Sequence, residues 1–168
     1  PNPYLNTYVW PNANDSLGNK IDLTRSDYNG NYVSTHIFEA QTGWVASYDP
    51  ISGILLGYAF SSKDYPWLNI WHQVDLEGNP VAKGLEFGTT GIGRHYQELI
   101  LQDLSFYGHY SYEFLDAGET ITKSYYMIAL RTNDLIDEIN DIQINNNQIR
   151  IRYNSIEVIV FDDLMLIK

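Results

Sequence analysis

The stretch WLNIWHQVDLEGNPVAKGLEFG, residues 67–88, decides the fold class of this chain. Residues 67–74 and 81–88 are short runs rich in apolar and aromatic side chains at alternate positions, a pattern that is typical of β-strands. Residues 75–80 between them contain Asp, Gly, Asn and Pro, which favour turns. The stretch therefore predicts an antiparallel β-hairpin.

Glu86 stands in the second run among glycine and alanine. A turn centred between Glu77 and Gly78 sets Trp71 opposite Gly84 and Asn69 opposite Glu86. Because side chains alternate, one face of the hairpin then holds Trp67, Asn69, Trp71 and Gln73 opposite Gly88, Glu86, Gly84 and Ala82. Large rings opposite missing side chains predict a shallow trough with a polar floor. The residues leave a second interpretation open, in which the tryptophans only shield backbone and Glu86 reaches solvent.

Other short runs surround this hairpin at intervals of about ten residues, the spacing of a β-sandwich or barrel. They are YVSTHIFEA (32–40), GWVASYD (43–49), ILLGYAFS (54–61), HYSYEFL (109–115) and TITKSYYMIAL (120–130), with turn residues between them. Residues 1–30 are rich in Asn, Asp, Gly and Pro and are expected to form a long loop with one short strand at residues 5–10. We therefore predict an all-β, antiparallel sandwich or supersandwich.

The region after residue 131 differs from the rest. Residues 132–140 have apolar side chains at helical spacing, so we expect at most one short helix there. In QIRIRY (148–153), Ile149 and Ile151 fall on one strand face and Arg150 and Arg152 on the other. We predict a sandwich domain over residues 1–131, which is half of a larger domain in one interpretation, and a C-terminal β appendix over residues 132–168.

Composition excludes several classes of function. The chain has 168 residues, enough for one domain with a core, and a formal net charge of −11. Ten scattered Lys and Arg supply no basic stripe for nucleic acid, and the charge disfavours an anionic membrane. There is no cysteine, and the Asn/Asp cluster of residues 1–30 lacks the spacing of a calcium loop. We expect no metal and no cofactor.

The order of four segments resembles the C-terminal half of galactose mutarotase-like (aldose 1-epimerase-like) proteins. The segments are GWVASYDPISGILLGYAF (43–60), YPWLNIWHQ (65–73), GLEFGTT (84–90) and AGETITKSYYMIAL (117–130). Within them, Pro66, Leu68, Ile70 and Trp71 match a "P-x-L-x-I-W" strand, Glu86 matches the position of the family's essential glutamate, and Gly118–Glu119 precede the aromatic pair Tyr125–Tyr126. The resemblance covers about residues 30 to 130.

This resemblance implies an antiparallel supersandwich that binds a sugar on a concave sheet face and interconverts its anomers. Glu86 would be the base that takes the proton of the anomeric hydroxyl, and a histidine acid would protonate the ring oxygen. None of the four histidines lies in a recognisable family motif, and His95 is the best candidate for the acid. Trp67, Asn69, Trp71 and Arg94 would contact the sugar.

Whether the chain is an enzyme stays open at this point. The alternative is a non-catalytic sugar-binding or structural sandwich domain of a larger carbohydrate-active protein, and a third interpretation is a sandwich whose tryptophans only pack. The expected partner is a carbohydrate rather than nucleic acid or a membrane. An exposed sheet edge would also favour a homodimer, or pairing with a missing N-terminal portion of the same chain. A periplasmic or secreted location is favoured over a cytoplasmic one.

Overall fold

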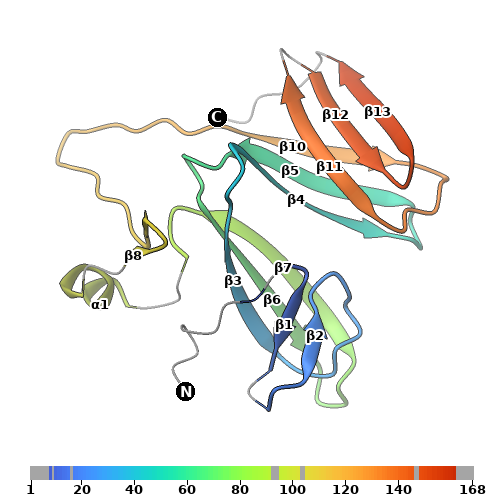
Figure 1. Cartoon of the computed structure of the whole chain (residues 1–168), viewed down its shortest axis with the longest axis horizontal. Helices are drawn as coiled ribbons and strands as arrows, with labels where there is room; N and C mark the ends of the chain where they lie inside the picture. Colours follow the sequence, from blue (N-terminus) through green and yellow to red (C-terminus); the bar gives the residue numbers. More distant parts are fainter. Residues whose placement is uncertain are drawn as a thin grey trace. The chain divides into compact units, whose positions relative to one another are not determined.

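The computed structural model describes residue 8 and residues 10–15, 17–91, 95–102, 105–145 and 148–161 (Figure 1). The chain divides into two compact units. Unit 1 contains residues 1–35 and 69–86, and unit 2 contains residues 36–68 and 87–168. In the part of the chain that is described, no helix is long and apolar enough to cross a membrane.

The described chain is built almost entirely of β-strands. Their order is β1 (Asn12–Asn14), β2 (Lys20–Asp22), β3 (Tyr32–Ile37), β4 (Thr42–Asp49), β5 (Ile54–Ser61), β6 (Trp67–Val74), β7 (Pro80–Gly88), α1 (Tyr96–Leu101), β8 (Ser105–Phe106), β9 (His109–Tyr110), β10 (Tyr125–Arg131), β11 (Ile139–Asn145), β12 (Gln148–Tyr153) and β13 (Ile156–Phe161). Every strand pair whose register is resolved is antiparallel.

Unit 1 contains most of a three-stranded sheet with strand order β3-β6-β7, together with the β1-β2 hairpin. One hydrophobic cluster of unit 1 contains Ala13, Ile21 and Leu23, against which the rings of Tyr28 and Tyr32 pack. The predicted long loop over residues 1–30 therefore contains a two-stranded hairpin. The strand expected at residues 5–10 lies largely outside the described residues.

The predicted hairpin around residues 75–80 is present as β6 and β7. Its turn is closed by the Asp75 N–H, which donates to the Asn79 carbonyl at 2.9 Å, and by the Gly78 N–H, which donates to the Asp75 carbonyl at 3.1 Å. Gly78 has a φ of 87°, which favours glycine. Asp75 thus pairs with Asn79 rather than with Pro80, one position from the register that the sequence suggested.

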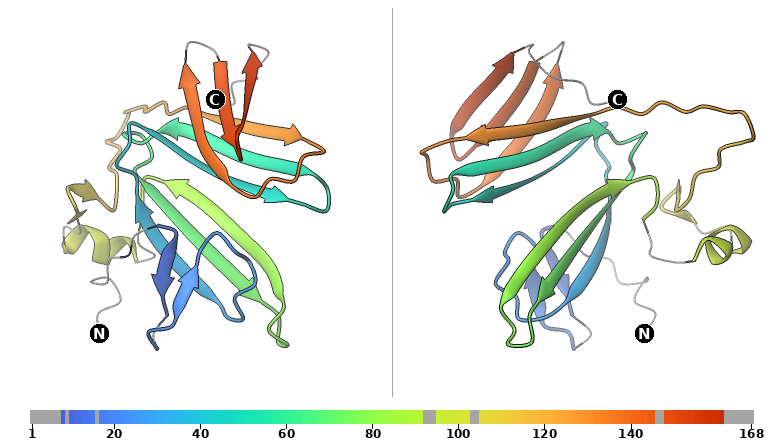
Figure 2. Two further views of the ribbon diagram at one scale, coloured as in Figure 1. Left: turned by 45° about the vertical axis from the view of Figure 1, so that its right-hand side comes forward. Right: turned by 180° about the vertical axis from the view of Figure 1, so that it is seen from behind.

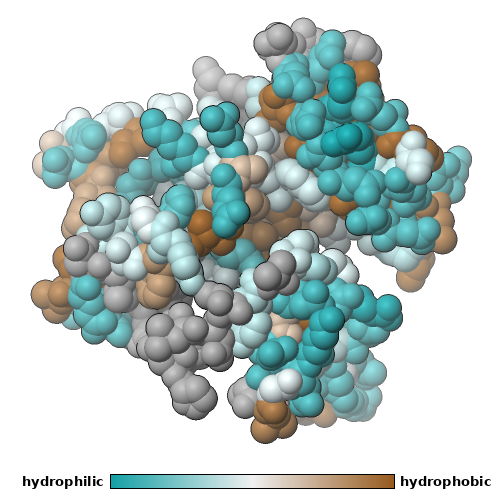
Figure 3. Space-filling model, viewed as in Figure 1, coloured by the Kyte–Doolittle hydropathy of each residue, from teal (hydrophilic) through white to brown (hydrophobic). Residues whose placement is uncertain are grey.

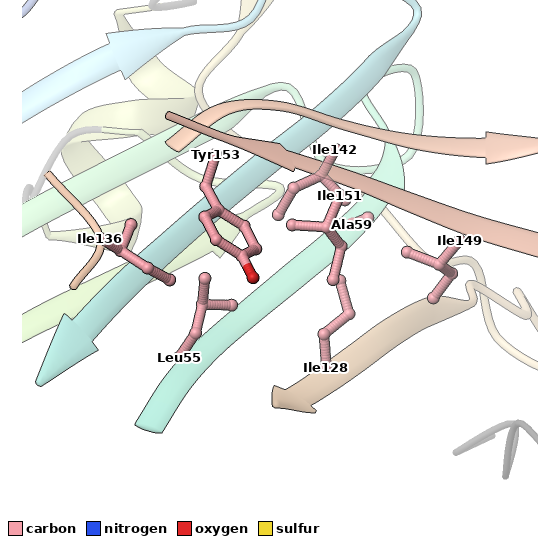
Figure 4. Close-up of a cluster of buried hydrophobic side chains, with 8 residues drawn as sticks. All are labelled: Leu55, Ala59, Ile128, Ile136, Ile142, Ile149, Ile151 and Tyr153. Atoms are coloured by element: carbon pink, nitrogen blue, oxygen red, sulfur yellow. The ribbon is translucent and has the colours of Figure 1, made fainter. Parts of the chain in front are cut away.

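Unit 2 contains a β-sandwich of two three-stranded sheets, β10-β5-β4 and β11-β12-β13, which lie face to face (Figures 1 and 2). Inward side chains pair across neighbouring strands, for example Leu130 with Leu55 and Ile151 with Ile142. Figure 4 shows the core between the sheets: Leu55, Ala59, Ile128, Ile136, Ile142, Ile149, Ile151 and Tyr153. The all-β, antiparallel sandwich predicted from the sequence is confirmed.

The outer face of β11–β13 is mostly polar, and it is mostly teal at the upper right of Figure 3. On β12, Ile149 and Ile151 are buried, whereas Arg150 and Arg152 point away from the core and form ion pairs with Glu157 and Asp141. The alternation predicted for this strand is therefore confirmed.

Two expectations about the region after residue 131 are wrong. The helix expected at residues 132–140 is absent, and the helix that the structure describes is α1, at residues 96–101. In the connecting segment, the Asn154 side chain accepts hydrogen bonds from the N–H groups of Asp137 and Glu138 and donates to the Leu135 carbonyl. The strands after residue 132 also share their core with β4, β5 and β10, so no boundary separates them as an appendix.

Candidate functional site

The candidate site is the face of the β3-β6-β7 sheet in unit 1 that carries Trp71. Because side chains alternate along a strand, Asn69 lies on the same face as Trp71, and Glu86 lies on the same face as Gly84. Asn69 and Trp71 are half-buried, and Glu86 is exposed. The face therefore presents the Trp71 ring together with amide groups and the Glu86 carboxylate.

Trp71 lies directly over Gly84. A Cβ atom built on Gly84 would come within 1.8 Å of the Trp71 Nε1 atom and 2.3 Å of its Cε2 atom. The indole can therefore occupy this position only because residue 84 is a glycine. The indole and Gly84 thus lie next to each other, and the half-buried indole keeps part of its surface accessible.

Asn69 is held by a neighbouring strand. The Thr35 hydroxyl on β3 donates to the Asn69 Oδ1 atom at 2.9 Å. This hydrogen bond orients the Asn69 amide, so this polar group is positioned before any ligand arrives.

The opposite face of the same sheet is occupied by the protein itself. His72 is 2 % exposed, its Nδ1 and Nε2 atoms lie 3.0 and 3.1 Å from the carbonyl oxygens of Gly30 and Ser26, and its ring stacks on Tyr32. The Lys83 ammonium donates to the carbonyls of Leu23 and Arg25. Burial lowers the pKa of Lys83, and the Asp22 carboxylate partly opposes this effect. His72 and Lys83 therefore have structural roles.

Trp67 does not belong to the candidate site. It is 2 % exposed, its indole N–H donates to the Tyr110 carbonyl at 2.8 Å, and its ring packs on the backbone of Gly91 and near Phe106. The expectation that Trp67 contacts a sugar is therefore wrong, because neither face of the ring is accessible. The sequence contains the relevant signal, since Gly91 leaves the space that this indole fills.

The remaining predicted site residues are Arg94 and His95. Arg94 lies outside the described residues. His95 is exposed and stands at the N-cap of α1, without a side-chain capping bond to the described helix. Glu86 belongs to unit 1 and His95 to unit 2, so neither unit by itself contains the predicted acid–base pair.

No metal site accompanies these residues in the part of the chain that is described. There, no group of three or more His, Asp or Glu side chains is placed to hold an ion.

Comparison of the chain with protein-family models, curated proteins and solved structures finds no match.

Proposed function

We propose that this chain is a carbohydrate-interacting domain that receives a sugar on the Trp71 face of unit 1. The observation that carries the proposal is the Trp71 indole lying over Gly84, with Asn69 and Glu86 on the same sheet face. The order of sequence segments that resembles galactose mutarotase-like proteins supports the same ligand class.

The chemistry of the face suits a neutral sugar. The C–H face of a pyranose is apolar and packs on an indole, which combines a large apolar surface with a polar edge. Sugar hydroxyls are both donors and acceptors, so they match a carboxylate, which only accepts, and an amide, which does both. Glu86 and Asn69 supply these two groups.

Binding without catalysis is the role that the geometry supports best. Anomer exchange needs a base for the anomeric hydroxyl and an acid for the ring oxygen, both within hydrogen-bond reach of the sugar. Unit 1 offers the Glu86 carboxylate, whereas the proposed acid, His95, belongs to unit 2. Epimerase activity remains the second candidate, because an exposed carboxylate beside an aromatic platform suits the base.

Saturation-transfer NMR with a panel of reducing monosaccharides tests the proposal. We expect transfer from the protein to at least one sugar, and loss of this transfer in Trp71→Ala. Tyr96→Ala, which removes an exposed aromatic ring from α1, is the matched control and should bind as the unmodified chain does. Absence of transfer to every sugar, or transfer unaffected by Trp71→Ala, would refute the proposal.

The same samples separate binding from catalysis. Proton NMR of a freshly dissolved single anomer measures its exchange rate. If the chain is an epimerase, exchange runs faster than in buffer and returns to the buffer rate in Glu86→Gln. If it is a binding domain, saturation transfer occurs while the exchange rate equals that of the buffer.

A further inference from the structure

Unit 2 contains a groove that none of the residues discussed above lines. Its volume is about 290 Å³, and its walls are Thr89, Glu113, Phe114, Leu115, Ile121 and Lys123. This volume is close to the lower end of the range for small-molecule sites, about 300 Å³. Except for Thr89, the lining residues come from the segment between β9 and β10, which emerges as a long extended loop in Figure 1.

The polar wall of the groove is fixed by several contacts. The Lys123 ammonium lies 2.7 Å from the Glu113 carboxylate and donates to the Asp64 carbonyl at 3.0 Å. At the tip of the loop, the Asp116 N–H donates to the Glu119 carboxylate, and the Glu119 N–H donates to the Asp116 carbonyl. The Glu113–Lys123 ion pair and the Asp116–Glu119 hydrogen bonds thus order the loop that forms the groove. A loop that is already ordered loses less conformational entropy when a ligand binds.

A row of aromatic rings leads into this groove. Tyr110, Tyr112 and Phe114 occupy alternate positions of an extended segment, and successive ring centroids are 5.6 and 5.2 Å apart. Tyr110 is 58 % and Phe114 55 % exposed. The backbone under the row is held by the hydrogen bond from Trp67 to the Tyr110 carbonyl. Phe114 belongs to both the row and the groove, so the two form one continuous surface, which we call the aromatic groove.

We propose that the aromatic groove binds an extended, neutral oligosaccharide. Successive sugar units pack along Tyr110, Tyr112 and Phe114, whose rings are tilted by 46° and 69° from one to the next, and hydroxyl groups reach Glu113 and Lys123. A Glu–Lys pair suits a hydroxyl because it offers an acceptor and a donor side by side, and the hydroxyl uses both. A row of several rings matches a chain of sugars better than a single sugar.

A proline-rich peptide is the competing ligand, since such peptides bind grooves lined by aromatic side chains. The backbone of such a peptide offers carbonyl groups, which only accept hydrogen bonds, and its prolines have no N–H group. The carbonyls could accept from Lys123, but nothing in the proline backbone could donate to the Glu113 carboxylate. The charged pair therefore favours a ligand with hydroxyl groups. The inference shares its ligand class with the proposed function but rests on different residues, all of them in unit 2.

Calorimetric titration of the full chain tests this inference. The probes are hexasaccharides of β-1,4-glucan, α-1,4-glucan, β-1,4-mannan, β-1,4-xylan and chitin, together with a decaproline peptide. We expect at least one hexasaccharide to bind, with a Kd at least tenfold higher in Phe114→Ala and in Tyr112→Ala. Phe114 is exposed, so its truncation should leave the circular dichroism spectrum unchanged. Tyr96→Ala, which alters neither proposed surface, should change the hexasaccharide Kd by less than twofold.

The outcomes separate this inference from the proposed function. Hexasaccharide binding that is lost in Trp71→Ala and kept in Phe114→Ala would overturn the aromatic groove and leave the Trp71 face standing. Binding of decaproline in place of every hexasaccharide would overturn the choice of ligand. Failure of all hexasaccharides to bind would also overturn the inference, whatever the monosaccharide experiment shows.

Discussion

Two tryptophans on β6 each pack on a glycine, but they differ in how far they are buried. Trp71 lies over Gly84 and Trp67 packs on Gly91, so each indole fills the space left by a missing side chain in the glycine-rich run after residue 82. Trp71 stays half-buried, while Trp67 is enclosed and hydrogen-bonded. Alternation in the sequence puts both rings on one face, but it could not reveal that Tyr110 and Phe106, distant in the chain, contact Trp67.

The Trp71 indole can keep its position only if residue 84 has no side chain. This condition leads to a prediction for a single substitution. In Gly84→Ala, the new methyl group would overlap the indole and displace it. We expect a shift in Trp fluorescence and at least tenfold weaker binding of any monosaccharide that binds the Trp71 face. In Gly88→Ala, the methyl group would meet only atoms 3.8 Å away, so binding should be unchanged. Equal effects of both substitutions would contradict the role given to Gly84.

The burial of His36 on β3 leads to a prediction that stability depends on pH. Burial lowers the pKa of His36 below its ordinary value of 6.5, so the unfolded chain binds a proton more readily than the folded one. The free energy of unfolding should therefore be highest above about pH 7 and fall as the pH drops through the ordinary histidine range.

Urea denaturation of the unmodified chain and of His36→Gln between pH 7.5 and about pH 5.5 measures this effect. The slope of unfolding free energy against pH should be smaller in His36→Gln. Parallel curves would show that His36 takes no part in the dependence.

At the scale of elements, the sequence predicts strands best where alternation is strict and long. The strands β4, β5, β6, β7 and β12 were anticipated from such patterns. The expected helix at residues 132–140 failed for a tertiary reason. Ile136 is drawn into the sandwich core, and Tyr48 donates to the Asp134 carbonyl. These contacts and those of Asn154 satisfy the backbone without a helix, and none of them is visible in a local pattern.

In the sandwich of unit 2, shortening a buried side chain should cost more stability than shortening an exposed one on the neighbouring strand. Ile151 on β12 is 0 % exposed, whereas Ile159 on β13 is 37 % exposed and pairs with Arg150 on the outer face. Ile151→Ala should lower the free energy of unfolding by about 2–5 kcal/mol. Ile159→Ala should change it by about 0.5 kcal/mol. Equal losses in chemical denaturation would contradict the assignment of the core.

For the whole molecule, the division into units could not be read from the sequence. Each unit is assembled from separated segments, and the chain passes from one to the other after residues 35, 68 and 86. A boundary near residue 132 was suggested by a change in pattern, but long-range pairing decides where the strands go. The strands β10 and β5 pair although more than sixty sequence positions separate them, so no local pattern shows which sheet β11–β13 pack against.

The exposed apolar side chains of unit 2 lead to a prediction for assembly. Ile54, Leu56 and Met127 are exposed on the face of the β10-β5-β4 sheet that points away from the sandwich core. Exposed apolar groups of this kind favour association. We predict a homodimer, detected by light scattering as twice the mass of one chain, and a weaker dimer in Leu56→Asp. A monodisperse monomer at high concentration would contradict the prediction.

The central claim is that a sugar meets the chain on Trp71, and the indole N–H signals in a proton–nitrogen correlation spectrum test it most directly. The chain has four tryptophans, so the signals can be assigned with single Trp→Phe variants. During titration with a monosaccharide, the Trp71 signal should shift and saturate, while the signal of the buried Trp67 should stay in place. A Trp71 signal that remains unmoved while the sugar binds, or a spectrum unchanged by every sugar of the panel, would contradict the claim.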